Sequence, residues 1–183
     1  QASVYQLDQE NVLTTNPVDT TYSTQSGAMR SRGVELEAKA SLSDAWDVVA
    51  SASRNDVKYT KDNDGREGRH PAGISPLTAS MWVNYTVLGD TPLAGLGAGL
   101  GVRYARQSLG DYYAGAFTVP SYSVYDASLS YDLGSSPLKL KGVKLAMNVQ
   151  NLTNKTYVSQ CTSDLDCYYG EGRTVVSSLT YDW

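Results

Sequence analysis

The feature that most constrains this chain is an alternation of apolar and polar residues with a period of two. Successive side chains of a β-strand point to opposite faces, so the pattern predicts strands that have one apolar and one polar face. The clearest case is VKLAMNVQ at 143–150, where every second residue is a large apolar one. The strands predicted in this way lie at 2–13, 33–40, 46–59, 77–87, 96–104, 125–133, 143–150 and 175–183.

The connections between these strands differ systematically in length. Short, turn-like connections are predicted at 41–45, 89–92 and 134–141. Long connections that are polar or rich in glycine are predicted at 14–29, 61–75, 106–120 and 152–173. Short turns on one side and long loops on the other are typical of an antiparallel up-and-down meander, and of outer-membrane barrels in particular.

A soluble β-sandwich is the alternative, because its strands alternate as well. The polar faces here carry too many charges for a shared dry core. The apolar faces carry tyrosines near strand ends, as an interfacial girdle of a membrane barrel would. No apolar run approaches the roughly 18–20 residues of a membrane helix. We therefore predict an all-β transmembrane meander of about eight strands. The charged residues of the polar faces are Glu35, Glu37, Lys39, Arg103, Asp126 and Asp132.

Charge and motif content exclude several classes of function. A net charge of −4 argues against a nucleic-acid partner, whose phosphates attract a basic surface. Nothing in the sequence places a nucleophile near His70, the single histidine, so we expect no enzyme; a Ser–His–Asp hydrolase stays an alternative. The stretch KDNDGREG at 61–68 resembles a calcium-binding loop but lacks the required ligands, so we expect a solvated loop and no metal site.

The glycines of GLGAGLGVRY at 95–104 do not have the G-x-G-x-x-G spacing of a dinucleotide-binding loop. In an alternating strand, Gly97, Gly99 and Gly101 instead share the inner, polar face with Arg103. We interpret this row as room for a bulky group inside the barrel, and a local bend or bulge is the alternative.

Cys161 and Cys167 are the two cysteines of the chain and lie six positions apart in a polar connection. Thiols this close should pair in the oxidising environment of a cell surface. Free thiols are the alternative, and the spacing does not fit a CxxC redox site. So short a loop gains only about 2–3 kcal/mol from cross-linking, and we expect the disulfide mainly to shape a loop tip.

Several segments, taken in order, resemble the TonB-dependent outer-membrane receptors. SRGVELEAKA at 31–40 resembles their RGxE strand, and NVQNLTNKTYVSQC at 148–161 resembles their penultimate strand with its NLxxxxY element. PSYSVYDASLSYDL at 120–133 and the tail YYGEGRTVVSSLTYDW at 168–183 fit the same family. The paired cysteines before the last strand resemble the ferric hydroxamate branch, with its ferrichrome- and ferrioxamine-type receptors. The residues that carry the two named elements are Arg32, Gly33, Glu35, Asn151, Leu152 and Tyr157.

The resemblance implies a receptor of the bacterial outer membrane that binds a ferric siderophore at the outer face and passes it inward. It implies energy from the TonB complex acting on an N-terminal plug, and no resident cofactor, because the siderophore carries the iron. It also implies contacts with lipid, lipopolysaccharide and the outer-membrane assembly machinery.

Strand arithmetic predicts how much of such a receptor the chain holds. At roughly 23 residues per strand and connection, a barrel of about 22 strands needs roughly 500 residues. We therefore expect residues 1–183 to be the C-terminal part of the barrel, with the plug domain and TonB box outside the chain and Gln1 at a cut. A self-contained barrel of about eight strands with a structural or adhesion role is the alternative.

The same resemblance places the siderophore contacts in the long connections. A bulky, oxygen-rich complex needs aromatic faces and a few donors, such as Arg106 or Gln107, rather than metal ligands. The segment between the cysteines lacks the aromatic residues of the ferrichrome branch, which argues against ferrichrome itself and leaves a related hydroxamate open. The alternative role of the tyrosines is loop packing or an outer aromatic girdle. The predicted contacts are Tyr112, Tyr113, Thr162, Leu165, Tyr168 and Tyr169.

The C-terminal residues Leu179, Tyr181 and Trp183 resemble the signal that the assembly machinery recognises in bacterial barrels. Members of the family usually end in phenylalanine, and Trp183 keeps an aromatic residue at that place. Across the last hairpin, we predict an ion pair between Lys144 and Asp182.

Overall fold

A computed structural model describes residues 1–113 and 115–183, whose regular structure consists of β-strands. Within this part of the chain, no helix is long and apolar enough to cross a membrane. Short strands form two hairpins inside the connections: β6 (Ser108–Leu109) with β7 (Thr118–Val119), and β10 (Val158–Ser163) with β11 (Asp166–Tyr169). The strands of the large sheet are β1 (Ala2–Thr15), β2 (Ser23–Ser43), β3 (Trp46–Lys61), β4 (Leu77–Thr86), β5 (Leu96–Ala105), β8 (Tyr122–Asp132), β9 (Val143–Gln150) and β12 (Thr174–Tyr181).

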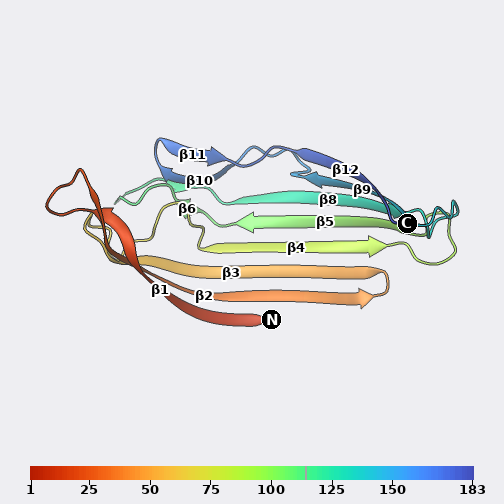
Figure 1. Cartoon of the computed structure of the whole chain (residues 1–183), viewed down its shortest axis with the longest axis horizontal. Helices are drawn as coiled ribbons and strands as arrows, with labels where there is room; N and C mark the ends of the chain where they lie inside the picture. Colours follow the sequence, from red (N-terminus) through yellow and green to blue (C-terminus); the bar gives the residue numbers. More distant parts are fainter. Residues whose placement is uncertain (114) are drawn as a thin grey trace.

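The large sheet is an up-and-down meander, as predicted. In the described residues it has eight strands, and each pairs antiparallel with its neighbours in the order β1-β2-β3-β4-β5-β8-β9-β12 (Figure 1). β1 and β12 form the edges of this sheet and are not paired with each other in the part of the chain described. The sheet is therefore open, and these strands do not form the closed small barrel considered as the alternative.

Long and short connections lie at opposite ends of the sheet. In Figure 1, β6, β10 and β11 lie at the left end, and the short turns lie at the right end with the C-terminus. The long connection predicted at 14–29 is wrong in extent, because β1 runs to Thr15 and β2 begins at Ser23. Backbone pairing continues there through a bulge at Asn11, which has a positive φ of 60°, although the side-chain alternation is lost.

The register separates apolar from polar residues across the whole sheet, which confirms the predicted two faces. Directly opposed residues of an antiparallel pair share a face, so rows of side chains can be followed from strand to strand. We call the two sides the apolar face and the polar face. A typical row of the apolar face consists of Leu36, Ala52, Ala79 and Tyr104. The adjacent row of the polar face consists of Glu37, Ser51, Ser80 and Arg103.

Aromatic residues lie on the apolar face at the short-turn end. The ring centroids of Trp46 and Tyr85 are 4.7 Å apart, and those of Tyr181 and Trp183 are 6.4 Å apart. Such residues suit the boundary between hydrocarbon and water, because each combines an apolar ring with a polar tip. They form the girdle expected at this rim.

The predicted ion pair between Lys144 and Asp182 is present at the same end, with Nζ and Oδ2 3.9 Å apart. Both side chains are exposed, so solvent screens the pair and its contribution to stability is small.

β1, β2 and β3 continue, at the long-connection end, past the point where the residues of the apolar face stop being apolar. β2 has 21 residues, whereas a tilted strand needs only about 9–11 residues to cross a bilayer. Along β2, the apolar face changes from Leu36 and Val34 to Arg32 and Arg30, and Arg30 is ion-paired with Asp8 of β1. Such a change is expected where a transmembrane sheet leaves the hydrocarbon and enters water.

A large side chain covers the glycines of β5 on the polar face. The six-membered ring of the Trp82 indole lies over Gly99 and Gly101: a Cβ at Gly99 would be 2.7 Å from Trp82 Cζ2, and a Cβ at Gly101 would overlap the ring. Trp82 Nε1 donates a hydrogen bond to Asn84 Oδ1 at 2.7 Å, which fixes the indole in this position. The bulky group predicted over the glycines is therefore a side chain of the neighbouring strand.

Replacement of Gly101 by valine should destabilise the protein by about 1–3 kcal/mol, because the branched side chain must displace the indole of Trp82. The temperature at which the folded band converts to the unfolded band in gel electrophoresis measures this loss. Adding Trp82→Ala to Gly101→Val should restore part of the stability. An equal loss with and without the indole would show that the two residues are not coupled.

Candidate functional site

Three connections pack together at the end of the sheet where ligand contacts were predicted. The Gly73 amide donates to the carbonyl of Leu109 at 2.9 Å, which joins the β3–β4 connection to the β5–β8 connection. β10 contacts β7, and both Cys161 and Val119 are buried there, at 2% and 3% exposure. We call residues 62–76, 106–113, 115–121 and 158–169 the loop cluster. It brings segments that are distant in the sequence to one surface.

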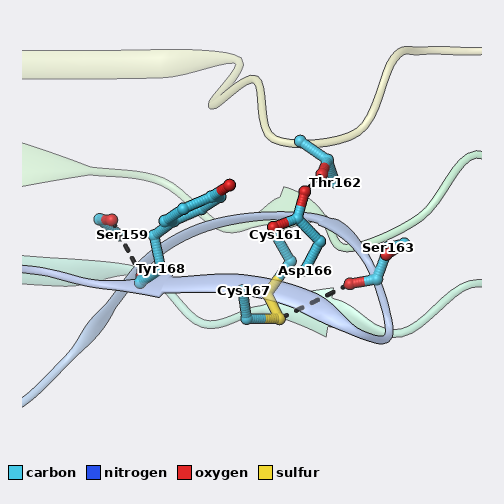
Figure 2. Close-up of a disulfide and its surroundings, with 7 residues drawn as sticks. All are labelled: Ser159, Cys161, Thr162, Ser163, Asp166, Cys167 and Tyr168. Atoms are coloured by element: carbon cyan, nitrogen blue, oxygen red, sulfur yellow. Dashed lines mark hydrogen bonds between the residues drawn. A yellow bond between two sulfur atoms is a disulfide. The ribbon is translucent and has the colours of Figure 1, made fainter.

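The β10–β11 hairpin is closed by a disulfide between Cys161 and Cys167 (Figure 2), which confirms the predicted pairing. The two cysteines are directly opposed in the hairpin register, with their Cα atoms 4.0 Å apart. The Thr162 hydroxyl donates to Asp166 Oδ2 at 2.5 Å, and the Ser159 hydroxyl donates to the carbonyl of Tyr168 at 3.0 Å. The hairpin is therefore held at its tip and at its base.

The hairpin presents most of the predicted ligand contacts to solvent. Leu165 at the tip is 93% exposed, and Tyr168 and Tyr169 are exposed as well. A hydrogen bond to the Asp166 carboxylate raises the pKa of Tyr168, so its hydroxyl stays protonated. Because the hydroxyl of Thr162 is hydrogen-bonded to Asp166, the methyl group of Thr162 is the part that a ligand could contact.

Tyr112 and Tyr113, the other predicted contacts, lie in the β5–β8 connection and pack against each other. Their ring centroids are 4.6 Å apart, and their hydroxyl oxygens are 3.4 Å apart. The guanidinium of Arg66 lies 5.2 Å from the Tyr112 ring centroid and 4.8 Å from that of Tyr59. Tyr112 thus has the loop-packing role that was the alternative to a ligand contact, whereas Tyr113 remains exposed.

Arg66 also organises the loop at 61–68, which is largely exposed, as predicted, but contains one buried carboxylate. The side chain of Asp62 is only 1% exposed. It accepts hydrogen bonds from Arg66 Nη2 at 2.7 Å, from the Arg66 amide at 2.9 Å and from the Thr14 hydroxyl at 3.1 Å. Burial of the carboxylate opposes ionisation, but these hydrogen bonds outweigh it and lower the pKa of Asp62 from 3.8 to about 2. The same guanidinium lies 2.7 Å from a carboxylate oxygen of Asp62 and 2.7 Å from one of Asp64, so it pairs with both charges.

Asn151 is a structural residue whose role the sequence did not reveal. It follows β9, is 2% exposed and has a positive φ of 49°. Its Nδ2 donates to the carbonyls of Lys155 and Glu171 at 2.8 and 3.0 Å, and its Oδ1 accepts from the Lys155 amide at 2.8 Å. The side chain thus joins both ends of the long connection that carries the disulfide hairpin. An asparagine directly after a strand is a signal for this left-handed conformation.

Tyr157 of the same NLxxxxY element packs on Tyr122 of β8, with ring centroids 4.4 Å apart. A Cβ at Gly170 would overlap the Tyr157 ring, so this glycine lets the connection pass over the aromatic pair. The element therefore fixes the path of the chain from β9 to the hairpin.

His70 does not have the surroundings of a catalytic base in the part of the chain described. Its Nδ1 lies 2.9 Å from the Val57 carbonyl and 3.4 Å from Asp56 Oδ1, and no serine hydroxyl is hydrogen-bonded to the ring. The described residues also contain no group of three or more His, Cys, Asp or Glu placed to hold a metal ion. What the loop cluster offers chemically is aromatic faces and hydrogen-bonding groups, which are features of a binding surface.

Comparison with known proteins assigns the barrel strands to a family. The family described as "TonB dependent receptor-like, beta-barrel" matches residues 1–152. The ferrichrome outer membrane transporter/phage receptor of Escherichia coli K12 is 40% identical over 179 residues, which cover 98% of this chain and 23% of that protein. The ferrioxamine receptor of Yersinia enterocolitica is 36% identical over 182 residues, which cover 100% of this chain and 25% of that protein.

Solved structures give the same result. The siderophore receptor PiuA from Acinetobacter baumannii superposes with a TM-score of 0.77 at 26% identity, over 98% of this chain and 25% of that protein. The chain therefore spans about a quarter of the length of the curated relatives it matches.

Stability should depend on pH through Asp62. Its pKa is about 2 in the folded protein against an ordinary 3.8, so the carboxylate stabilises the fold fully above pH 4. This contribution, roughly 2 kcal/mol, is lost as the pH falls through about 2. The difference in melting temperature between the wild type and Asp62→Asn should therefore shrink as the pH falls from about 4 to about 2. A gap that does not change with pH would contradict the assignment.

Loss of the Asn151 side chain should loosen the long connection that follows β9. Asn151→Gly tolerates the positive φ and removes only the side-chain hydrogen bonds, at an expected cost of about 2–3 kcal/mol. Asn154→Gly is the matched control, because Asn154 also has a positive φ but accepts one bond, from the Arg173 amide. Limited proteolysis between 151 and 173 should be accelerated in the first variant far more than in the second. Equal rates would contradict this role for Asn151.

Proposed function

Because the chain belongs to the TonB-dependent receptor β-barrel family of the bacterial outer membrane, we propose that the protein is a receptor that imports a ferric siderophore of the hydroxamate class. The observation that carries this proposal is the identity of 40% and 36% to a ferrichrome transporter and a ferrioxamine receptor, over nearly the whole chain. The exposed aromatic residues and the disulfide hairpin at the long-connection end support it.

The rest of the receptor must complete the barrel. Unpaired backbone groups are too costly in lipid, so the edges at β1 and β12 require partner strands. The relatives are about four times as long as this chain, which is enough for the further strands of a large barrel and for a plug. In this proposal, residues 1–183 are the C-terminal strands, and the TonB complex acts through a plug encoded elsewhere in the protein.

The ligand in this proposal binds over the loop cluster. A ferric siderophore has its iron already coordinated, so the receptor supplies aromatic surface and hydrogen bonds and needs no cofactor of its own. The exposed large side chains of the cluster that fit this task are Tyr113, Leu165, Tyr168 and Tyr169. Tyr112, which packs on Tyr113, and Thr162, which is hydrogen-bonded to Asp166, complete the proposed contacts.

Assembly in the outer membrane is proposed to use the C-terminal residues of β12. Leu179 and Tyr181 lie opposite Leu145 and Val143 on the apolar face, and Trp183 follows beyond the strand. This leaves an exposed row that ends in aromatic rings, which the assembly machinery would recognise together with β12 as an edge strand.

A double variant tests the proposed ligand site. Tyr168→Ala with Tyr169→Ala should weaken binding of ferrioxamine B by about tenfold, because two exposed aromatic contacts are lost. Quenching of intrinsic fluorescence in the purified receptor measures the affinity. Tyr22→Ala is the control, since Tyr22 is equally exposed but lies in the β1–β2 connection. Failure of the wild type to bind any ferric hydroxamate would refute the proposed function, whereas unchanged affinity in the double variant would refute the site alone.

A further inference from the structure

A pocket of about 250 Å³ lies where the loop cluster meets β3, between the β3–β4 and β5–β8 connections. Its floor is formed by Asn55 and Val57 of β3. These residues alternate with those of the apolar face and share the polar face with Ser51 and Ser53, so the pocket belongs to the interior side of the sheet. The backbone amide of Asn55 donates a hydrogen bond to the carbonyl of Pro76 at 3.1 Å, which fixes the floor of the pocket against the β3–β4 connection.

The side chain of Asn55 has an unusual environment. Its Oδ1 atom is buried and has no hydrogen-bond partner in the part of the chain described. Buried carbonyl oxygens are nearly always paired, and one that is not calls for a donor from outside the chain. Since Asn55 lines the pocket, a donor group of a molecule held there would satisfy this oxygen.

Other polar groups of the pocket complement Asn55. The Val57 carbonyl can only accept, so the hydrogen bond at 2.9 Å places a proton on Nδ1 of His70. Arg106 lines the opposite side of the pocket, and among residues 1–113 and 115–183 no carboxylate is paired with its guanidinium. The pocket thus combines the unpaired acceptor of Asn55 with a free donor group.

The remaining walls are apolar. Val57, Ile74 and Leu109 provide aliphatic surface, and two prolines of the β3–β4 connection close the side. At about 250 Å³ the space is smaller than the roughly 300–1,000 Å³ of a site for a whole drug-sized ligand. It fits one arm of a bulky ligand rather than the ligand itself.

We propose that this pocket is a subsite for an alkyl arm that carries a secondary amide. The amide N–H would be donated to Asn55 Oδ1, its carbonyl would accept from Arg106, and the alkyl chain would lie on Val57, Ile74 and Leu109. A secondary amide is the simple group that supplies both a donor and an acceptor to such a site. The inference rests on the proposed function and narrows it to siderophores with amide-containing alkyl linkers.

The test pairs a variant with a modified ligand in the intact receptor. Asn55→Leu keeps the size of the side chain and removes the acceptor, and Ser53→Ala is the control on the same strand and face outside the pocket. The probes are ferrioxamine B, a linear ferric trihydroxamate with secondary amides in its linkers, and the same compound with those amides N-methylated. We expect Asn55→Leu to weaken binding of ferrioxamine B by about tenfold, the effect of one hydrogen bond. N-methylation should weaken binding to the wild type by a similar factor and leave binding to Asn55→Leu unchanged.

The outcomes separate this inference from the function on which it rests. Because Asn55 Oδ1 has no partner, Asn55→Leu should leave thermal stability unchanged, which a structural role would not. If the wild type binds ferrioxamine B and Asn55→Leu binds it equally well, the subsite is refuted and the receptor function stands. If Asn55→Leu lowers thermal stability but not affinity, the pocket holds a peptide amide of the protein's own remaining chain, and the inference is also refuted. If the wild type binds neither probe, both the function and the subsite are refuted.

Discussion

The need to pair every backbone amide and carbonyl away from water determines this structure. In hydrocarbon an unpaired peptide group costs several kcal/mol, and a continuous antiparallel ladder removes that cost in the interior of the sheet. Once the ladder is formed, the side chains need no common core. Leu36 and Leu100 are accordingly 52% and 65% exposed in the chain alone, as expected of side chains on the outer face of a membrane barrel. The same ladder explains why β2 can continue into water, where only its outward residues change from apolar to charged.

The regular part of the structure could be predicted from the sequence because it follows local alternation. The segment 143–150 was predicted with the bounds of β9, since each of its residues contacts only lipid, the interior or a neighbouring strand. The prediction failed where the backbone pairing of a strand continues but the alternation of apolar and polar side chains does not. Residues 23–29 read as a loop but belong to β2, because a bulge shifts the side chains while the backbone bonds continue. Strand ends above the membrane are therefore harder to predict than the spans within it.

The candidate site could be predicted only in outline. The disulfide could be predicted because its cysteines are only six positions apart. The contacts of Arg66 with Tyr112, of Asn151 with Glu171 and of Trp82 with Gly101 could not, because they join residues of different elements whose approach depends on the folded path. The unpaired oxygen of Asn55 is hidden from sequence for the same reason, since burial of one atom depends on everything packed around it.

The glycines beneath Trp82 determine how far this side chain protrudes from the polar face of the sheet. On a strand without glycines opposite it, the tryptophan side chain would project away from the sheet by much of its length. Here the missing side chains of Gly99 and Gly101 let the ring lie down against the backbone, where it thickens the wall by only about 3.5 Å, one van der Waals layer. The polar face thereby carries a rigid aromatic ring that protrudes from the sheet by little more than its own thickness.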